Sequence, residues 1–191
     1  MEIRSFLAFD LPIDMASVIH RVSGTLRKTP LDVRWVKEGN IHLTMIFLGN
    51  IKADDLGPIE EAVGNTCARF GPFSLFLSGI GCFPNVRNPR VIWFGLEGDL
   101  ERLSGFRDAL QKPLKDFGVK EEKRPFRPHL TIGRFRTIGK IRERLEDLLQ
   151  AYREVRSPDC LLDRLTLFKS TLNPSGAVYT KLASWPLEGE H

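Results

Sequence analysis

Cysteine is scarce in this sequence, and long apolar runs are missing from it. Only 3 of the 191 residues are cysteine, Cys67, Cys82 and Cys160, and no two of them form a C-x-x-C pair. This odd count excludes a disulfide framework and a zinc ribbon, and it indicates a reducing, cytoplasmic compartment. The strictly apolar stretches are short, for example Val91–Phe94, whereas a membrane-spanning helix needs about 20 such residues. Because residues 1–10 also lack the basic start and long apolar core of a signal peptide, we expect a cytoplasmic protein without a membrane partner.

The chain has little excess of either charge. Lys and Arg number 28 against 24 Asp and Glu, which gives a formal net charge of +4. This excess favours anionic partners but is too weak alone to indicate nucleic acid. With 42% hydrophobic and 27% charged residues, the composition is that of a folded protein, and the length fits one two-lobed domain spanning residues 1–191. No long exposed apolar stripe stands out, so we expect a monomer.

Strands and helices are expected to alternate along the whole chain, which predicts the α+β class. The two halves have a similar content, which indicates an internal duplication. Gly49-Asn50 is expected to end one strand, and Pro113 to kink or end a helix. Asp54 or Asp55 offers the cap of another helix. The expected strands cover residues 3–9, 33–36, 41–48, 73–80, 91–96, 129–135, 160–170 and 177–183, the expected helices 13–28, 54–70, 99–117 and 138–152, and an expected loop 81–89.

Two of the four histidines begin the same tripeptide, His-Leu-Thr, close to half the chain apart. On a strand, residues i and i+2 point to the same face. His42 and Thr44 are therefore expected to project together, as are His129 and Thr131. The other two histidines lie elsewhere: one within a predicted helix, where a surface position is expected, and one at residue 191.

The repeated pair suggests acid–base chemistry at a phosphate. If the two halves face each other about a pseudo-two-fold axis, two imidazoles and two hydroxyls converge on one cleft. A neutral imidazole can take a proton from water while a protonated one gives a proton to a leaving oxygen, and an ordinary pKa of about 6.5 allows both forms near neutrality. The hydroxyls can donate hydrogen bonds to the non-bridging oxygens. Because both motifs read alike, their spacing does not assign the base and the acid.

Basic residues flank the second motif. Arg124 and Arg127 precede it and Arg134 follows it, and arginine suits bidentate contacts with phosphate. Arg134 is our candidate phosphate ligand, although strict alternation points it away from His129, so that a twist or strand end near the intervening glycine is needed. Phe126 is expected to be a packing residue, with stacking on a nucleobase as the alternative.

Residues 41–49 and 124–134 resemble the paired H-x-T-x motifs of the two-histidine phosphoesterases. The resemblance is closest to the bacterial and archaeal RNA 2′,3′-cyclic phosphodiesterases, long called 2′-5′ RNA ligases, and it covers nearly the whole chain. Both motifs are intact. Further matching segments are residues 4–10, 33–36, 83–85, 89–93, 167–170 and 176–179.

This resemblance implies a two-lobed α+β fold with antiparallel sheets facing a central cleft, helices outside and a pseudo-two-fold duplication. It also implies opening of RNA 2′,3′-cyclic phosphate ends to 2′-phosphomonoesters without a metal or other cofactor, and in some members 2′-5′ joining of RNA ends. RNA ends or small cyclic nucleotides would be the substrates. By position, His129 would be the base that activates water and His42 the acid that protonates the departing 3′ oxygen, while Thr44 and Thr131 would hold the phosphate.

Two other interpretations remain from the residues. The first is an RNA-end or nucleotide phosphate-binding protein that grips a terminal phosphate without catalysis. The second is a two-histidine metal hydrolase, which is disfavoured because no carboxylate stands at H-x-x-E or H-E-x-x-H spacing from either motif.

Overall fold

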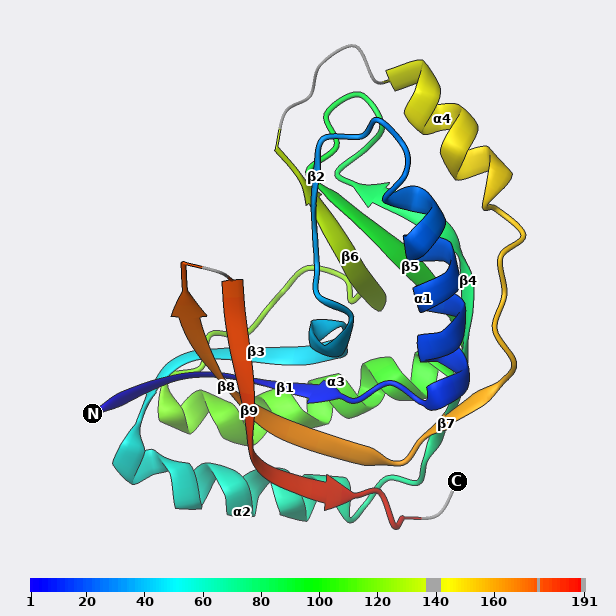
Figure 1. The fold of residues 1–191 in the computed structure, drawn as a ribbon. Coiled ribbons are helices and arrows are strands. Elements are labelled where there is room, and N and C mark those ends of the chain that lie inside the picture. Colours follow the sequence, from blue (N-terminus) through cyan, green and yellow to red (C-terminus); the bar gives the residue numbers. More distant parts are fainter. Residues whose placement is uncertain (137–141, 175, 190–191) are drawn as a thin grey trace.

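Two antiparallel β-sheets with helices packed against them make up the fold (Figure 1). The computed structural model describes residues 1–136, 142–174 and 176–189. The first sheet has the strand order β3–β1–β8–β9 and the second β2–β6–β5–β4–β7. The strands of the first sheet are β1 (Glu2–Phe9), β3 (Leu43–Lys52), β8 (Arg164–Asn173) and β9 (Gly176–Pro186). Those of the second sheet are β2 (Val33–Trp35), β4 (Phe73–Phe83), β5 (Val91–Gly98), β6 (His129–Phe135) and β7 (Cys160–Leu162).

The helices divide between the two sheets. The α-helices are α1 (Ile13–Leu26), α2 (Leu56–Cys67), α3 (Leu100–Leu114) and α4 (Arg142–Ala151). Figure 1 shows α2 and α3 alongside the strands of the first sheet and α4 at the opposite end of the molecule, beside the second. α2 packs against β9 and α4 against β4, whereas α3 packs against both β3 and β4. α1 reaches the second sheet, where the backbone of Met15 meets the thiol of Cys160 in β7. The predicted α+β class is therefore confirmed.

The topology contains a duplication in which each half of the chain places its last corresponding strand, β4 or β8, in the sheet of the other half. The order β1–α1–β3–α2–β4 corresponds to β5–α3–β6–α4–β8. In the first sheet β1 pairs with β3 from its own half and with β8 from the other. In the second sheet β5 pairs with β6 from its own half and with β4 from the other. Each sheet thus takes strands from both halves of the chain, so the halves do not form one lobe each.

The core joins the two sheets. Phe9 of β1, Phe73 of β4 and Phe106 of α3 contact one another, with ring centroids 5.4, 6.0 and 6.1 Å apart, and all three are fully buried. The alternating apolar pattern predicted at residues 73–78 is confirmed, because Leu75 and Leu77 are buried while the intervening side chains are not. That residues 1–191 form one domain stays a prediction.

Several predicted boundaries were wrong for physical reasons. β3 continues past Gly49 to Lys52, because Gly49 adopts a positive φ of 76° beside a bulge and does not end the strand. β4 runs to Phe83, so the first part of the expected loop is strand. Residues 53–55 form a 3₁₀ turn, and Asp55 precedes α2 without a capping side-chain hydrogen bond.

The remaining helix ends agree better with the sequence. Pro113 lies in the last turn of α3, which ends one residue later, because proline has no N–H to continue the helix. The helix expected over residues 138–152 is described as α4 from Arg142 to Ala151, and residues 138–141 lie outside the described residues, as does His191.

Candidate active site

The first motif lies at the beginning of β3. Thr44 pairs with Ala8 of β1 and so faces the same side of the sheet, whereas Leu43 is buried in the core. His42 directly precedes the strand, and its ring stacks on Phe6 with centroids 4.7 Å apart. The edge of Tyr179 from β9 meets the same imidazole at 5.3 Å. Aromatic side chains from two other strands therefore hold this imidazole.

The second motif lies at the beginning of β6 and has a similar surrounding. His129 is the first residue of the strand, and Thr131 pairs with Trp93 of β5. The edge of the Phe83 ring meets the imidazole at 5.0 Å and 90°, and Trp93 lies 6.3 Å from it. Both predicted histidines are thus packed against aromatic rings on one side.

The two imidazoles share one hydrogen-bond pattern. Nδ1–H of His42 donates to the carbonyl oxygen of Asn40 at 2.8 Å, and Nδ1–H of His129 donates to that of Arg127 at 2.7 Å. Each acceptor stands two residues before its histidine. Because a carbonyl oxygen only accepts, the proton of the neutral ring is assigned to Nδ1. Nε2 of each histidine is then left to exchange protons with a substrate.

The strands that carry the two motifs meet between the sheets. β3 lies at the edge of the first sheet, and β6 lies one strand from the edge of the second. Backbone contacts join β3 to β6 (Figure 1). The strands that follow the two histidines are therefore in contact between the sheets, and the convergence of both His-x-Thr pairs on one cleft stays a prediction.

A β-bulge turns Arg134 to the same face as Thr131. Val91 pairs with Arg134 and Trp93 with Thr131, which leaves one extra residue, Ile132, on β6. Val91 and Trp93 share a face because they are two residues apart, so their partners share that face too. The expectation that Arg134 needs a local irregularity is confirmed, and its positive charge acts on His129.

The corresponding bulge in β3 exposes a residue that the sequence analysis missed. Thr44 pairs with Ala8 and Ile46 with Leu7, so that Phe47 faces the same side as Thr44. Phe47 is 70% exposed, and its ring lies 6.1 Å from Phe6. The signal was available, since Phe47 stands three residues after its threonine as Arg134 does after Thr131.

Burial and charge set the proton affinity of the two imidazoles. Burial lowers the pKa of both His42 and His129 below the ordinary value of 6.5. The hydrogen bond to the i−2 carbonyl raises the pKa of each ring in part. The charges differ, because the Asp10 carboxylate raises the pKa of His42 whereas the Arg134 guanidinium lowers the pKa of His129.

Asp10 belongs to a small polar cluster on the first sheet. Its Oδ2 accepts from Nζ of Lys181 at 2.6 Å and from Oγ1 of Thr166 at 3.5 Å. Lys181 also lies 5.9 Å from the ring of Phe168, which is stacked 5.2 Å from Phe6. No local motif indicated this cluster, because Asp10 follows β1 whereas Thr166 and Lys181 lie in β8 and β9, more than half the chain away.

The other flanking residues have structural partners. Arg124 forms an ion pair with Glu122. Phe126 packs against the core with the guanidinium of Arg107 5.1 Å from its ring centre, so its interpretation as a packing residue is confirmed. His20 of α1 is exposed, as expected.

The described residues hold neither a metal-binding cluster nor a membrane-spanning helix. Within residues 1–136, 142–174 and 176–189, no group of three or more His, Cys, Asp or Glu side chains could hold a metal ion. In the same part of the chain, none of the helices is long and apolar enough to cross a membrane.

The exchanged two-sheet fold and the paired H-x-T strands define a two-histidine phosphoesterase. The sequence pattern of the 2′-5′ RNA ligase superfamily matches residues 25–174, and the chain belongs to this superfamily. An RNA 2′,3′-cyclic phosphodiesterase of Methanothermobacter thermautotrophicus is 32% identical over 182 residues, covering 95% of this chain and 97% of the relative. Another from Thermotoga maritima is 31% identical over 187 residues, covering 97% and 96%.

Solved structures share the fold over almost the full length. The crystal structure of TT0787 of Thermus thermophilus matches with a TM-score of 0.80 at 26% identity, covering 98% of this chain and 100% of that one. LigT of E. coli in complex with 3′-AMP matches with a TM-score of 0.75 at 25% identity, covering 98% and 99%.

Proposed function

We propose that this protein hydrolyses the 2′,3′-cyclic phosphate at RNA ends to a 2′-phosphomonoester by two-histidine acid–base catalysis. One observation carries the proposal. His42 and His129, each fixed by the same backbone hydrogen bond, begin the two strands that meet between the sheets. The relatives of matching length that are named RNA 2′,3′-cyclic phosphodiesterase support the substrate.

His129 acts as the general base. Burial and the neighbouring Arg134 lower its pKa, so the neutral imidazole predominates near neutral pH. Its Nδ1 proton is held by the Arg127 carbonyl. Nε2 therefore takes the proton of a water molecule, whose oxygen attacks the phosphorus.

His42 acts as the general acid. Burial lowers the pKa of His42 overall, and the hydrogen bond to Asn40 and the Asp10 carboxylate offset part of this effect by raising the pKa, whereas the charge beside His129 lowers the pKa of that ring further. The protonated Nε2 gives its proton to the 3′ oxygen as the bond between phosphorus and that oxygen breaks. The 2′ phosphate ester bond remains. The difference in charge beside the two rings supports this assignment, which the sequence left open.

Thr44, Thr131 and Arg134 hold the phosphate. Both threonines face the side of their sheet on which the histidine rings lie, and the bulge brings Arg134 to the face of Thr131. Hydroxyl and guanidinium donors aimed at non-bridging oxygens strengthen as charge develops in the transition state. Phe47, exposed on the face of Thr44, offers a ring on which the terminal base stacks.

The same residues support 2′-5′ joining of RNA ends, in which an alcohol replaces water as the nucleophile. We propose that the protein works on RNA ends or small cyclic nucleotides, as a monomer and without a metal ion. All three cysteines are free, which supports a reducing, cytoplasmic location.

Product analysis tests the proposal directly. An oligonucleotide ending in a 2′,3′-cyclic phosphate is incubated with the protein, and the new end group is identified. A 2′-phosphate is expected. A 3′-phosphate would reverse the identity of the leaving oxygen, and binding without any product would indicate a phosphate-binding protein.

A further inference from the structure

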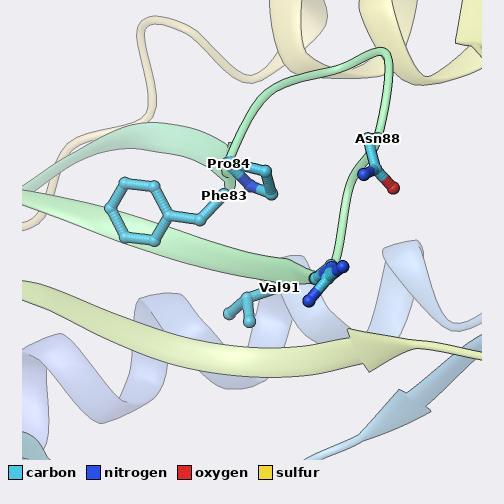
Figure 2. Close-up of a pocket in the computed structure, with 5 residues that line it drawn as sticks. Phe83, Pro84, Asn88 and Val91 are labelled. Atoms are coloured by element: carbon cyan, nitrogen blue, oxygen red, sulfur yellow. The ribbon is translucent and has the colours of Figure 1, made fainter.

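A hollow lies beside His129 on the face of the second sheet that carries Thr131. Phe83, Pro84, Asn88, Arg90 and Val91 line it, and its volume is about 330 Å³ (Figure 2). This volume is within the usual range for small-molecule sites. The mechanism above does not use this hollow.

The walls of the hollow combine an apolar floor with polar groups at the rim. Figure 2 shows the Phe83 ring, Pro84 and Val91 along one side and the Asn88 amide on the loop opposite. Arg90 adds a guanidinium that has no ion-pair partner among the side chains that the structure describes. An apolar surface beside a few directed polar groups is the composition of sites for planar, polar ligands such as nucleosides.

Backbone hydrogen bonds fix the loop that forms this rim. Oδ1 of Asn85 accepts from the backbone N–H groups of Arg87 and Asn88 at 3.0 and 3.1 Å. The N–H of Arg90 donates to the carbonyl of Phe83 at 2.7 Å, and the carbonyl of Arg90 accepts from Phe135 at 3.0 Å. The rim is therefore preorganised, and a side chain can be truncated there without removing these bonds.

The position of the hollow relative to the two histidines indicates what it binds. Phe83, which lines it, also contacts His129, and Val91 pairs with Arg134. In an in-line displacement the nucleophile enters on the side of the base, opposite the leaving oxygen. The hollow thus adjoins the nucleophile side of the site, whereas Phe47 belongs to the sheet that carries His42.

We infer that the hollow binds the 5′-terminal nucleoside of an RNA whose free 5′-hydroxyl replaces water, an inference that rests on the proposed function. Nε2 of His129 takes the proton of the 5′-hydroxyl, and a bond forms between that oxygen and the phosphorus. The bond from phosphorus to the 3′ oxygen breaks, and the 3′ oxygen takes the proton of Nε2 of His42. The product is a 2′-5′ phosphodiester, no atom is lost, and proton exchange with solvent restores both rings.

The experiment measures how the protein divides one donor between two nucleophiles. Adenosine 2′,3′-cyclic phosphate is the donor and a short 5′-hydroxyl oligoribonucleotide is the acceptor, with the same oligonucleotide carrying a 5′-phosphate as the blank. We expect Arg90→Ala to lower the ratio of 2′-5′ product to 2′-phosphate about tenfold, the usual effect of losing one charged contact, and Asn88→Ala to lower it less. Arg87→Ala removes the same charge from the same loop without touching the hollow, so the ratio should stay unchanged.

Each other outcome overturns the inference. An unchanged ratio in Arg90→Ala and Asn88→Ala, with native thermal melts, would show that the hollow does not hold the acceptor. A raised KM for the cyclic nucleotide with an equal fall in both products would place the donor base there. Hydrolysis without any transfer in the unaltered protein would also overturn it. If the unaltered protein shows neither transfer nor hydrolysis, the proposed function itself is refuted. This result is obtained before any variant is made, so it is distinguishable from failure of the inference.

Discussion

The two histidines keep the same backbone hydrogen bond but have charges of opposite sign beside them. Nδ1 of each ring is bound to the carbonyl two residues earlier, and the neighbouring charge comes from Asp10 for His42 and from Arg134 for His129. The identical bond gives both rings the same tautomer. In the mechanism we propose, the different charges separate their roles, so that two copies of one motif supply the acid and the base.

Replacing either histidine tests this division of labour. We expect His42→Ala and His129→Ala each to lower kcat on a 2′,3′-cyclic mononucleotide roughly 10²–10⁴-fold, because one proton transfer is lost in each variant. His20→Ala is the matched control, since that side chain is 74% exposed and pairs with Glu38 on the surface. Near-normal turnover in either of the first two variants, with an unchanged melting temperature, would contradict the assignment.

Replacing Asp10 by Asn should move only the alkaline limb of the pH profile of kcat/KM. The proposed mechanism needs neutral His129 and protonated His42. Because the pKa of each is below 6.5, the bell-shaped profile of kcat/KM should lie on the acidic side of neutrality. Asp10→Asn removes the charge that raises the pKa of His42. That pKa then falls, and the alkaline limb moves to lower pH while the acidic limb, set by His129, stays in place.

The control for this profile is Glu61→Gln, which removes an equal charge from an exposed position on α2. Its profile should superimpose on that of the unaltered protein. An unmoved profile in Asp10→Asn, or movement of a limb to higher pH, would contradict the effect of the Asp10 carboxylate on His42.

Among the elements, the bulges in β3 and β6 decide which side chains reach the site. Strict alternation would direct Arg134 and Phe47 away from the threonine of their own motif, but one extra residue in each strand returns both to that face. In β6 the bulge adjoins Gly133. A Cβ added to Gly133 would lie 2.4 Å from Cγ1 of Val33 and 3.1 Å from Cγ2 of Ile92, so the glycine allows the close approach of β2 and β5.

Gly133→Ala should therefore destabilise the protein by about 1–3 kcal/mol, the usual cost of overpacking a core. It should also lower kcat/KM, because Arg134 directly follows the displaced backbone. Gly105→Ala on the exposed side of α3 is the control, since a Cβ there meets nothing within 4 Å, and it should stabilise the helix by about 0.5–1 kcal/mol. Urea unfolding measures both effects. Equal stabilities of the two variants would contradict this account of Gly133.

The sequence predicts where these strands lie along the chain better than it predicts which strands pair and in which register. Periodicity located the strand at 129–135 with both boundaries correct, and the repeated tripeptide located His42 and His129, because both signals lie within a few consecutive residues. The bulges were not predicted, since they depend on the register against β1 and β5. Tyr179 and Asp10 were missed for the same reason: the strands that bring them to His42 are neighbours only after the sheet has formed.

At the scale of the whole molecule, each half of the chain contributes strands to the sheet that the other half begins. β8 completes the sheet of β1, and β4 completes the sheet of β5. The buried aromatic contacts of Phe9, Phe73 and Phe106 cross from one sheet to the other. Neither half of the chain can unfold without removing a strand from the sheet that the other half begins.

We therefore expect a single cooperative unfolding transition for residues 1–191. Calorimetry should give equal calorimetric and van't Hoff enthalpies, and far-ultraviolet circular dichroism and tryptophan fluorescence should give coincident melting curves. Two resolved transitions would indicate separate domains and would contradict the prediction of one two-lobed domain.

Removal of metal ions should leave the activity unchanged. The proposed chemistry uses side chains alone: two imidazoles for the proton transfers, and hydroxyl and guanidinium groups for the phosphate. Dialysis against EDTA followed by the cyclic nucleotide assay tests this, with Mg²⁺ and Zn²⁺ added back as the control. Loss of turnover that either ion restores would show that a metal takes part.

The exchange of strands also constrains how such a molecule can arise. A chain of half this length, with only β1, α1, β3, α2 and β4, would leave one edge of β1 open, and an open edge is prone to pair with another chain. Two copies would close both sheets by trading their last strands, which gives a homodimer with a histidine from each copy at its symmetry axis. Fusion of two such genes would preserve the pairing of β1 with β3 and β8 and that of β5 with β6 and β4. It would also free each copy to acquire its own neighbouring charge, which a symmetric dimer forbids.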